Sequence, residues 1–210
     1  MSFQDFTSVN VALKKYNLFL HSEETIDYSQ IPPIPLNEVI MELIKFDLKH
    51  QCGIISEHAL CESLIYPLLR EAWRRHPNLH VWSHIPIQVD DDLTGVPDYL
   101  VARESPQGLA ELNVPLLIVI EAKREDFVVG WGECLAAMVA AQKLNMEITP
   151  LPIIYGIVTT GRLWEFAQLD NRDFTMHSFG LSLAQVDVLL GVLDYIFAEC
   201  EAQLAKILIG

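Results

Sequence analysis

The spacing of apolar residues predicts helices near both ends of the chain and strands between them. Apolar residues recur every three to four positions in three segments: residues 36–50, 56–76 and 182–208. Ser56 is a suitable N-cap for the second helix, and Pro67 is expected to kink or divide it. Residues 1–37 become rich in proline towards their end and are expected to be irregular.

The middle of the chain has the pattern of a buried β-sheet. Residues 80–89 and 96–102 read as the arms of a hairpin. Continuous apolar runs then predict three central strands, over residues 114–123, 153–159 and 163–169. A helix over residues 130–145 should join the first two strands, and a turn at Thr160 should precede the third. The strand–helix–strand unit should join two parallel neighbours by a right-handed crossover. We therefore expect an α/β fold, with a mixed central sheet flanked by helices.

Length and composition favour one core domain. The chain has 210 residues, of which 51% are hydrophobic, so either the core is large or a partner covers apolar surface. A homodimer formed through the final helix or the sheet edge is expected. We interpret residues 1–50 as an N-terminal extension with one helix packed on the core, and 51–210 as the core domain. No apolar run reaches the roughly 18 residues of a membrane span. The N-terminus does not resemble a secretory signal, so a cytoplasmic location is expected.

The charge balance is strongly acidic. The chain carries 14 Lys and Arg against 28 Asp and Glu, a net charge of −14. This opposes tight non-specific binding to nucleic acid, which depends on neutralising phosphates. The local distribution matters more than the sum, since a bound divalent metal would add positive charge where it is needed.

Cysteine and histidine show no metal-binding pattern in the sequence. The cysteines are widely spaced and form no CxxC pair, so a zinc site is not expected and buried, reduced thiols are: Cys52, Cys61, Cys134 and Cys200. Three histidines lack the spacing of ligands on a helix and are interpreted as non-ligands: His76, His80 and His84.

Charged residues at the end of one central strand carry the candidate chemistry. Glu121 and Lys123 follow an apolar run, and alternation along a strand places them on one face. If Asp98 on the preceding strand lies beside Glu121, two carboxylates and one ammonium converge. Two carboxylates suit Mg²⁺, which would polarise a phosphodiester, while Lys123 assists the attacking water. The alternative is an Asp98 turn cap beside a surface ion pair.

The same residues resemble a known signature. Pro97-Asp98 followed by Glu121-Ala122-Lys123 is similar to the motif of the PD-(D/E)xK nuclease superfamily, which includes many restriction endonucleases. Residues 56–69 resemble its first core helix, and residues 121–145 and 154–166 resemble nuclease-fold proteins common in cyanobacteria. The resemblance runs from about Ser56 to the C-terminus. It implies a restriction-endonuclease-like fold and hydrolysis of DNA with Mg²⁺ or Mn²⁺.

In that superfamily a glutamate of the first core helix often completes the metal site. Glu57 lies within about 40° of the centre of the helix's apolar stripe, and Glu62 about 100° away. We prefer Glu57 as the metal ligand and keep Glu62 as an additional candidate. The alternatives are a first-turn residue favoured by the helix dipole for Glu57 and a solvated charge for Glu62.

Five further residues are secondary candidates. The cyanobacterial group commonly has Gln at the position of Glu133, which is therefore an additional ligand or a first-turn acidic residue. Gln142 lies on the same helix and faces either the site or solvent. Arg124, beside the site, and Arg70 and Arg74 are candidate phosphate contacts, although the latter two also suit a helix C-terminus.

The sequence thus predicts a metal-dependent nuclease acting on DNA, to which a partner protein could supply specificity. Two other readings stay open. One is a nuclease-fold binding or regulatory module that cuts nothing, which the acidic balance favours. The other is an interaction protein that acts through its hydrophobic C-terminal helix.

Overall fold

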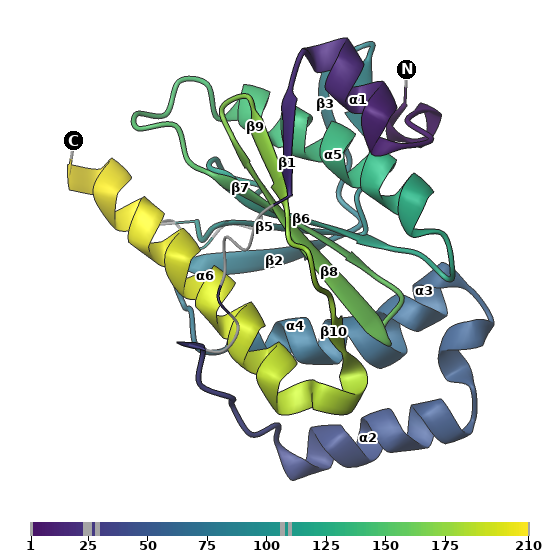
Figure 1. Cartoon of the computed structure of the whole chain (residues 1–210). Helices are drawn as coiled ribbons and strands as arrows, with labels where there is room; N and C mark the ends of the chain where they lie inside the picture. The colour runs from purple at the N-terminus through teal and green to yellow at the C-terminus, as the bar shows by residue number, and fades with distance from the viewer. Residues whose placement is uncertain (1, 23–26, 28–29, 106–107, 109–110, 210) are drawn as a thin grey trace.

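One large mixed β-sheet lies between helices in the computed structural model, which describes residues 2–22, 27, 30–105, 108 and 111–209 (Figure 1). Its strand order is β1-β9-β8-β7-β6-β5-β2, and β10 pairs with β8. The bounds are β1 Phe19–Ser22, β2 Leu79–Ser83, β5 Tyr99–Arg103, β6 Leu116–Ala122, β7 Ile154–Thr159, β8 Leu163–Asp170, β9 Asp173–Met176 and β10 Leu181–Ser182. A separate hairpin joins β3 (Ile87–Asp90) to β4 (Leu93–Gly95). The expected α/β class is confirmed.

The centre of the sheet follows the apolar pattern. Every residue of β6 and β7 is buried, as continuous apolar runs predict for strands covered on both faces. β6 and β7 are parallel, whereas β5 with β6 and β7 with β8 are antiparallel. The predicted hairpin is present in part. Its arms pair as the antiparallel strands β2 and β5, but residues 80–89 form two strands, β2 and β3, and β4 lies where a turn was expected.

Helices cover both faces of the sheet (Figure 1). α1 and α5 lie against one face, and α3, α4 and α6 against the other, so that the core has two parts. The α-helices are α1 Val9–Tyr16, α2 Glu38–Lys49, α3 Glu57–Leu60, α4 Tyr66–Trp73, α5 Phe127–Leu144 and α6 Val186–Ile209. The short helical segments are η1 Phe3–Asp5, η3 Cys52–Ile54, η4 Cys61–Ile65 and η5 Leu183–Gln185.

The helix predicted over residues 56–76 is divided, as Pro67 leads one to expect. Ser56 caps its start by accepting a hydrogen bond from the backbone N–H of Ala59 at 3.1 Å. Between α3 and α4 the chain forms the π-helical segment η4, and Pro67 is the second residue of α4. Proline lacks an N–H and its ring crowds the carbonyl four residues back, so a wider turn just before it relieves the clash.

The prediction that residues 1–37 are irregular is wrong. This region contains η1, α1 and β1, so residues 1–50 hold two α-helices, α1 and α2, rather than the one expected. β1 pairs in parallel with β9 at the sheet edge. The backbone of Phe6 and Ser8 packs so closely on α5 that a Cβ on Gly132 would lie 2.0 Å from the Phe6 carbonyl oxygen. These long-range contacts stabilise α1 and β1. They cannot be predicted from the spacing of apolar residues within the segment. Of the proline-rich segment 28–35, residues 28 and 29 lie outside the described residues.

Among the described residues, one helix is long and apolar enough to cross a membrane by length and composition alone. This helix is α5, and 67% of it is buried inside the protein. Its small apolar residues pack on β6 and β7 and under α1. Burial in the core accounts for the apolar character of α5.

Candidate active site

Asp98 and Glu121 lie opposite each other where β5 and β6 meet. Tyr99 pairs with Ile120, and the antiparallel register therefore sets Asp98 beside Glu121. One oxygen of Asp98, Oδ2, accepts a hydrogen bond from the backbone N–H of Ala122 at 2.7 Å. Glu121 is only 4% exposed. The two strands thus hold two carboxyl groups together in a largely dry place.

The carboxyl group of Glu121 is electrostatically destabilised in its charged form. Burial raises its pKa well above the ordinary value, and the nearby Asp98 raises it further. Lys123 acts in the opposite direction without cancelling these effects, and Glu133 adds to the upward shift. Additional positive charge at this place would stabilise the ionised carboxylate. A strongly shifted carboxyl group beside a second carboxyl group is typical of functional sites.

Lys123 is held by a glutamate from α5. Its Nζ lies 3.0 Å from Glu133 Oε2, and both side chains are nearly nine-tenths buried. Burial alone would lower the pKa of Lys123, but Glu121, Glu133 and Glu57 together raise it. Gly130 makes room for the stem of this lysine, since a Cβ there would lie 2.8 Å from Lys123 Cγ. Lys123 is therefore a positioned ammonium ion beside the two carboxyl groups.

Helix α5 begins earlier than predicted, and this changes the interpretation of Glu133. Its first residue is Phe127, and Asp126 caps it by accepting a hydrogen bond from Val129 N at 3.0 Å. Glu133 is the seventh residue of the helix and pairs with Lys123, so it is not a first-turn residue. Gln142 is nine residues further on, about 13 Å along the axis and rotated by about 180°. It therefore lies on the other face of α5, away from the site.

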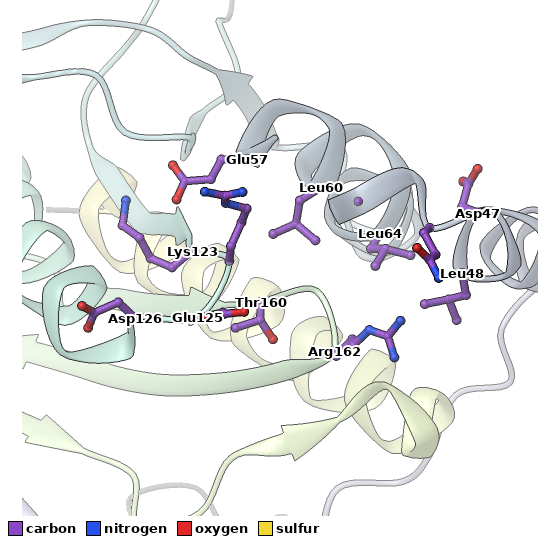
Figure 2. Close-up of a pocket in the computed structure, with 13 residues that line it drawn as sticks. Asp47, Leu48, Glu57, Leu60, Leu64, Lys123, Glu125, Asp126, Thr160 and Arg162 are labelled. Atoms are coloured by element: carbon purple, nitrogen blue, oxygen red, sulfur yellow. The ribbon is translucent and has the colours of Figure 1, made fainter. Parts of the chain in front are cut away.

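A cleft of about 520 Å³ opens beside Lys123 (Figure 2). Glu57, the first residue of α3, directs its carboxylate towards Lys123, and Arg162 lies at the opposite end near Leu48. Leu60 and Leu64 form an apolar wall. The charged residues that line the cleft are Lys123, Arg124 and Arg162, with Asp47, Glu57, Glu125 and Asp126. The cleft has the size of a small-ligand or nucleotide pocket and presents both signs of charge.

Several predicted residues lie elsewhere. Glu62 is exposed on η4 and is not among the residues that line the cleft. Arg70 and Arg74 are also outside the cleft lining. The Arg70 guanidinium lies 5.7 Å from the centre of the Tyr66 ring, and Arg74 pairs with Glu71 at 2.9 Å. Of the predicted phosphate contacts, the structure brings only Arg124 to the cleft, and Arg162 is an addition that the sequence did not suggest.

Two residues that the sequence interpretation set aside lie against Asp98. Cys61 Sγ is 3.8 Å and His84 Nε2 is 3.3 Å from Asp98 Oδ1. The three ligand atoms lie within 4.8 Å of one another, which makes this group able to hold a metal ion. Burial, followed by the charge of Asp98, raises the pKa of Cys61 to about 12. The missed signal was strand register: Ser83 pairs with Tyr99, so His84 falls opposite Asp98.

No protein-family model matches this chain, and no curated protein matches it in sequence. The candidate function is therefore argued from the fold and from the chemistry of the residues around Asp98 and Glu121.

Proposed function

We propose that this protein is a metal-dependent nuclease of the PD-(D/E)xK type, with a restriction-endonuclease-like fold, that hydrolyses phosphodiester bonds in DNA. The observation that carries the proposal is the placement of Asp98 beside Glu121, with Lys123 two residues further along and lining a cleft that the two carboxyl groups themselves do not line. Two carboxylates can hold a metal ion, and one ammonium ion can stabilise the charge that develops during phosphodiester hydrolysis.

The carboxyl groups fit the expected ion, Mg²⁺ or Mn²⁺. Asp98 and Glu121 would hold it, with Glu57 close enough to raise the pKa of Lys123 and so to assist. These are hard oxygen donors, which Mg²⁺ prefers. Burial and then the nearby Asp98 raise the pKa of Glu121, and the positive charge of a divalent ion would offset both effects. When bound, such an ion polarises the phosphodiester and acidifies a bound water.

Lys123 would act on the attacking water or on the phosphoryl oxygens. Its ammonium group donates hydrogen bonds and carries the charge that stabilises a developing negative charge. Glu133, paired with Lys123 at 3.0 Å, fixes the direction of that group. We assign Glu133 as a positioning residue for Lys123, in place of the metal-ligand role that its sequence position also allowed.

Arg124 and Arg162 would contact the phosphates of the substrate on either side of the reacting group. Both line the cleft, and guanidinium groups bind phosphate oxygens in pairs. With a net charge of −14, the protein should bind DNA weakly unless a divalent ion is present. A homodimer is part of this proposal, since β1 is an edge strand and exposes Phe19 and Leu20.

A binding module that does not cut DNA is the second candidate. The observation that favours it is the acidic surface, together with the engagement of Lys123 by Glu133. Such a protein would bind Mg²⁺ through Asp98 and Glu121 and would leave every tested nucleic acid intact.

The test combines metal titration with plasmid nicking. Isothermal titration of Mg²⁺ and Mn²⁺ into the wild type and Asp98→Ala is run beside a supercoiled-plasmid assay with the same ions. We expect binding and nicking in the wild type, with both lost in Asp98→Ala. Glu62→Ala is the matched control, because Glu62 is an exposed acidic residue outside the cleft, and it should behave as wild type. Binding without nicking supports the module, and full activity in Asp98→Ala overturns the nuclease assignment.

A further inference from the structure

Cys61, His84 and Asp98 come from three separate elements and converge on one point. Cys61 begins η4, His84 follows β2, and Asp98 precedes β5. The backbone N–H of His84 donates to the Asp98 carbonyl oxygen at 3.0 Å, which joins the second and third of these segments. Cys61 is 1% exposed, while His84 and Asp98 are half-buried. The cluster is therefore a fixed feature of the fold.

The distances between the three ligand atoms suit a tetrahedral ion. Ordinary zinc bond lengths place an imidazole nitrogen and a carboxylate oxygen about 3.3 Å apart, and either of them about 3.6 Å from a thiolate sulfur. The observed values are 3.3 Å from His84 Nε2 to Asp98 Oδ1 and 3.8 Å from Cys61 Sγ to the same oxygen. The distance from sulfur to nitrogen is no more than 4.8 Å. A rotation of the Cys61 side chain would shorten the distance between the sulfur and the His84 nitrogen.

The imidazole of His84 is oriented for coordination. Its Nδ1 lies 2.7 Å from Ser83 Oγ, and its ring stacks on His58 with centroids 4.8 Å apart. Nε2 is buried and makes no hydrogen bond within the described part of the chain, although it lies near Asp98. A hydrogen bond at one ring nitrogen typically fixes the tautomer of a histidine whose other nitrogen binds a metal.

The backbone of His84 is strained. Its φ of 52° lies in the left-handed region, which residues with a Cβ adopt uncommonly and at some cost, although histidine is found there more often than most side chains. Such strain persists where the surrounding structure enforces it, and it concentrates at functional positions. Here the conformation directs the ring towards Cys61 and Asp98.

We propose that Cys61, His84 and Asp98 form a second metal site, specific for a borderline transition-metal ion such as Zn²⁺ or Co²⁺. A thiolate and an imidazole select these ions over Mg²⁺. On binding, the Cys61 thiol loses its proton to solvent, the thiolate bonds to the ion, and water takes the fourth position. Asp98 is then shared between this site and the Asp98–Glu121 pair. The inference goes beyond the proposed nuclease activity and does not rest on it.

The test is a Co²⁺ titration of the reduced protein, followed by absorption spectroscopy. We expect one equivalent of Co²⁺ to produce a thiolate-to-cobalt charge-transfer band in the near ultraviolet, and one equivalent of Zn²⁺ to remove it. Cys61→Ser should abolish the band. His84→Asn should weaken Co²⁺ binding by about tenfold or more, and asparagine suits the left-handed backbone there. This variant keeps the test decisive if Cys61→Ser fails to fold, which circular dichroism reports.

Cys52→Ser is the matched control. Cys52 is the cysteine that retains partial exposure, so it is the rival source of a thiolate signal. The band should persist unchanged in this variant. The proposal is overturned by a wild type without the band, by loss of the band in Cys52→Ser, or by His84→Asn binding Co²⁺ as tightly as wild type. Each of these results is independent of whether the protein cleaves DNA.

Discussion

Two clusters of charged residues, each with a buried member, differ in how well their opposite charges are matched. In the first, His76 lies between two carboxylates of α6: Nδ1 is 2.9 Å from Glu201 Oε2 and Nε2 is 3.2 Å from Asp194 Oδ1. Asn78 donates two further hydrogen bonds to Glu201. Burial alone would raise the pKa of Glu201, but the hydrogen bonds from His76 and Asn78 lower it.

The second cluster, around Asp98 and Glu121, is unbalanced. Lys123 is the cation that acts on Glu121, and it is already paired with Glu133. The pKa of Glu121 is raised where that of Glu201 is lowered. The first cluster connects the residues after α4 to α6 by favourable contacts. In the second, the pairing of β5 with β6 holds the two carboxyl groups together against their repulsion. A missing positive charge is what distinguishes a candidate site from a structural ion pair.

The largest effect should come from removing charge at the unbalanced cluster. Glu121→Gln keeps the shape of the side chain but removes a metal ligand. We expect cleavage to fall by about 10³-fold, which corresponds to several kcal/mol of lost transition-state stabilisation. The free energy of unfolding should stay the same or rise by about 1 kcal/mol, because a neutral amide avoids the cost of burying a charge and the repulsion from Asp98. Plasmid nicking and thermal unfolding measure the two effects, and a large loss of stability would contradict the comparison.

The balanced cluster should respond in the opposite way. His76→Ala empties the place of a buried imidazole and removes a hydrogen-bond partner from both Glu201 and Asp194, so the free energy of unfolding should fall by about 2 kcal/mol. Cleavage per folded molecule should be unchanged. Lys45→Ala is the control, since its ion pair with Glu42 is exposed on both sides and contributes about 0–1 kcal/mol. Urea denaturation gives the stabilities, and a loss of activity in folded His76→Ala would undermine the distinction between the clusters.

Added Mg²⁺ should stabilise the protein only through the unbalanced cluster. An ion at 100 times its dissociation constant stabilises the folded state by about 2.7 kcal/mol. For a domain of this size, that raises Tm by roughly 5–10 °C. The shift should disappear with a chelator and be absent in Glu121→Gln, and His76→Ala should show it in full from a lower starting Tm. An equal shift in Glu121→Gln would place the bound Mg²⁺ elsewhere.

The sequence predicted the parts of the site that depend on local pattern. The apolar run of β6 places Glu121 and Lys123 on one face at its end, and alternation alone is enough to see this. Helix α5 begins three residues before the predicted start because Asp126 caps it, so Glu133 is not a first-turn residue. Its contact with Lys123 depends on where the helix begins.

The rest depends on long-range geometry. His84 lies near Asp98 because of the register of β2 with β5, and Cys61 lies there because of the packing of η4. Neither contact produces a periodic pattern in the sequence. Arg162 reaches the cleft because Gly161 turns the chain sharply with a φ of 72°. α1 and β1 owe their structure to α5 and β9, so propensity within residues 1–37 could not predict them.

The smallest effect concerns a second histidine, His177, which is partly buried, whereas His76 is buried. Burial lowers the pKa of His177 from 6.5 to about 4. The unfolded chain therefore binds a proton more readily than the folded protein between pH 6.5 and 4, and the stability that His177 contributes is lost as the pH falls through this window. The side chain is partly exposed, so solvent screening reduces the effect to about 1–2 kcal/mol.

The check is urea denaturation of the wild type and His177→Gln at pH 7 and pH 4.5. The difference in unfolding free energy between the two proteins should change by this amount between the two pH values, since the other titrating groups cancel, and parallel pH dependences would show that His177 is solvated.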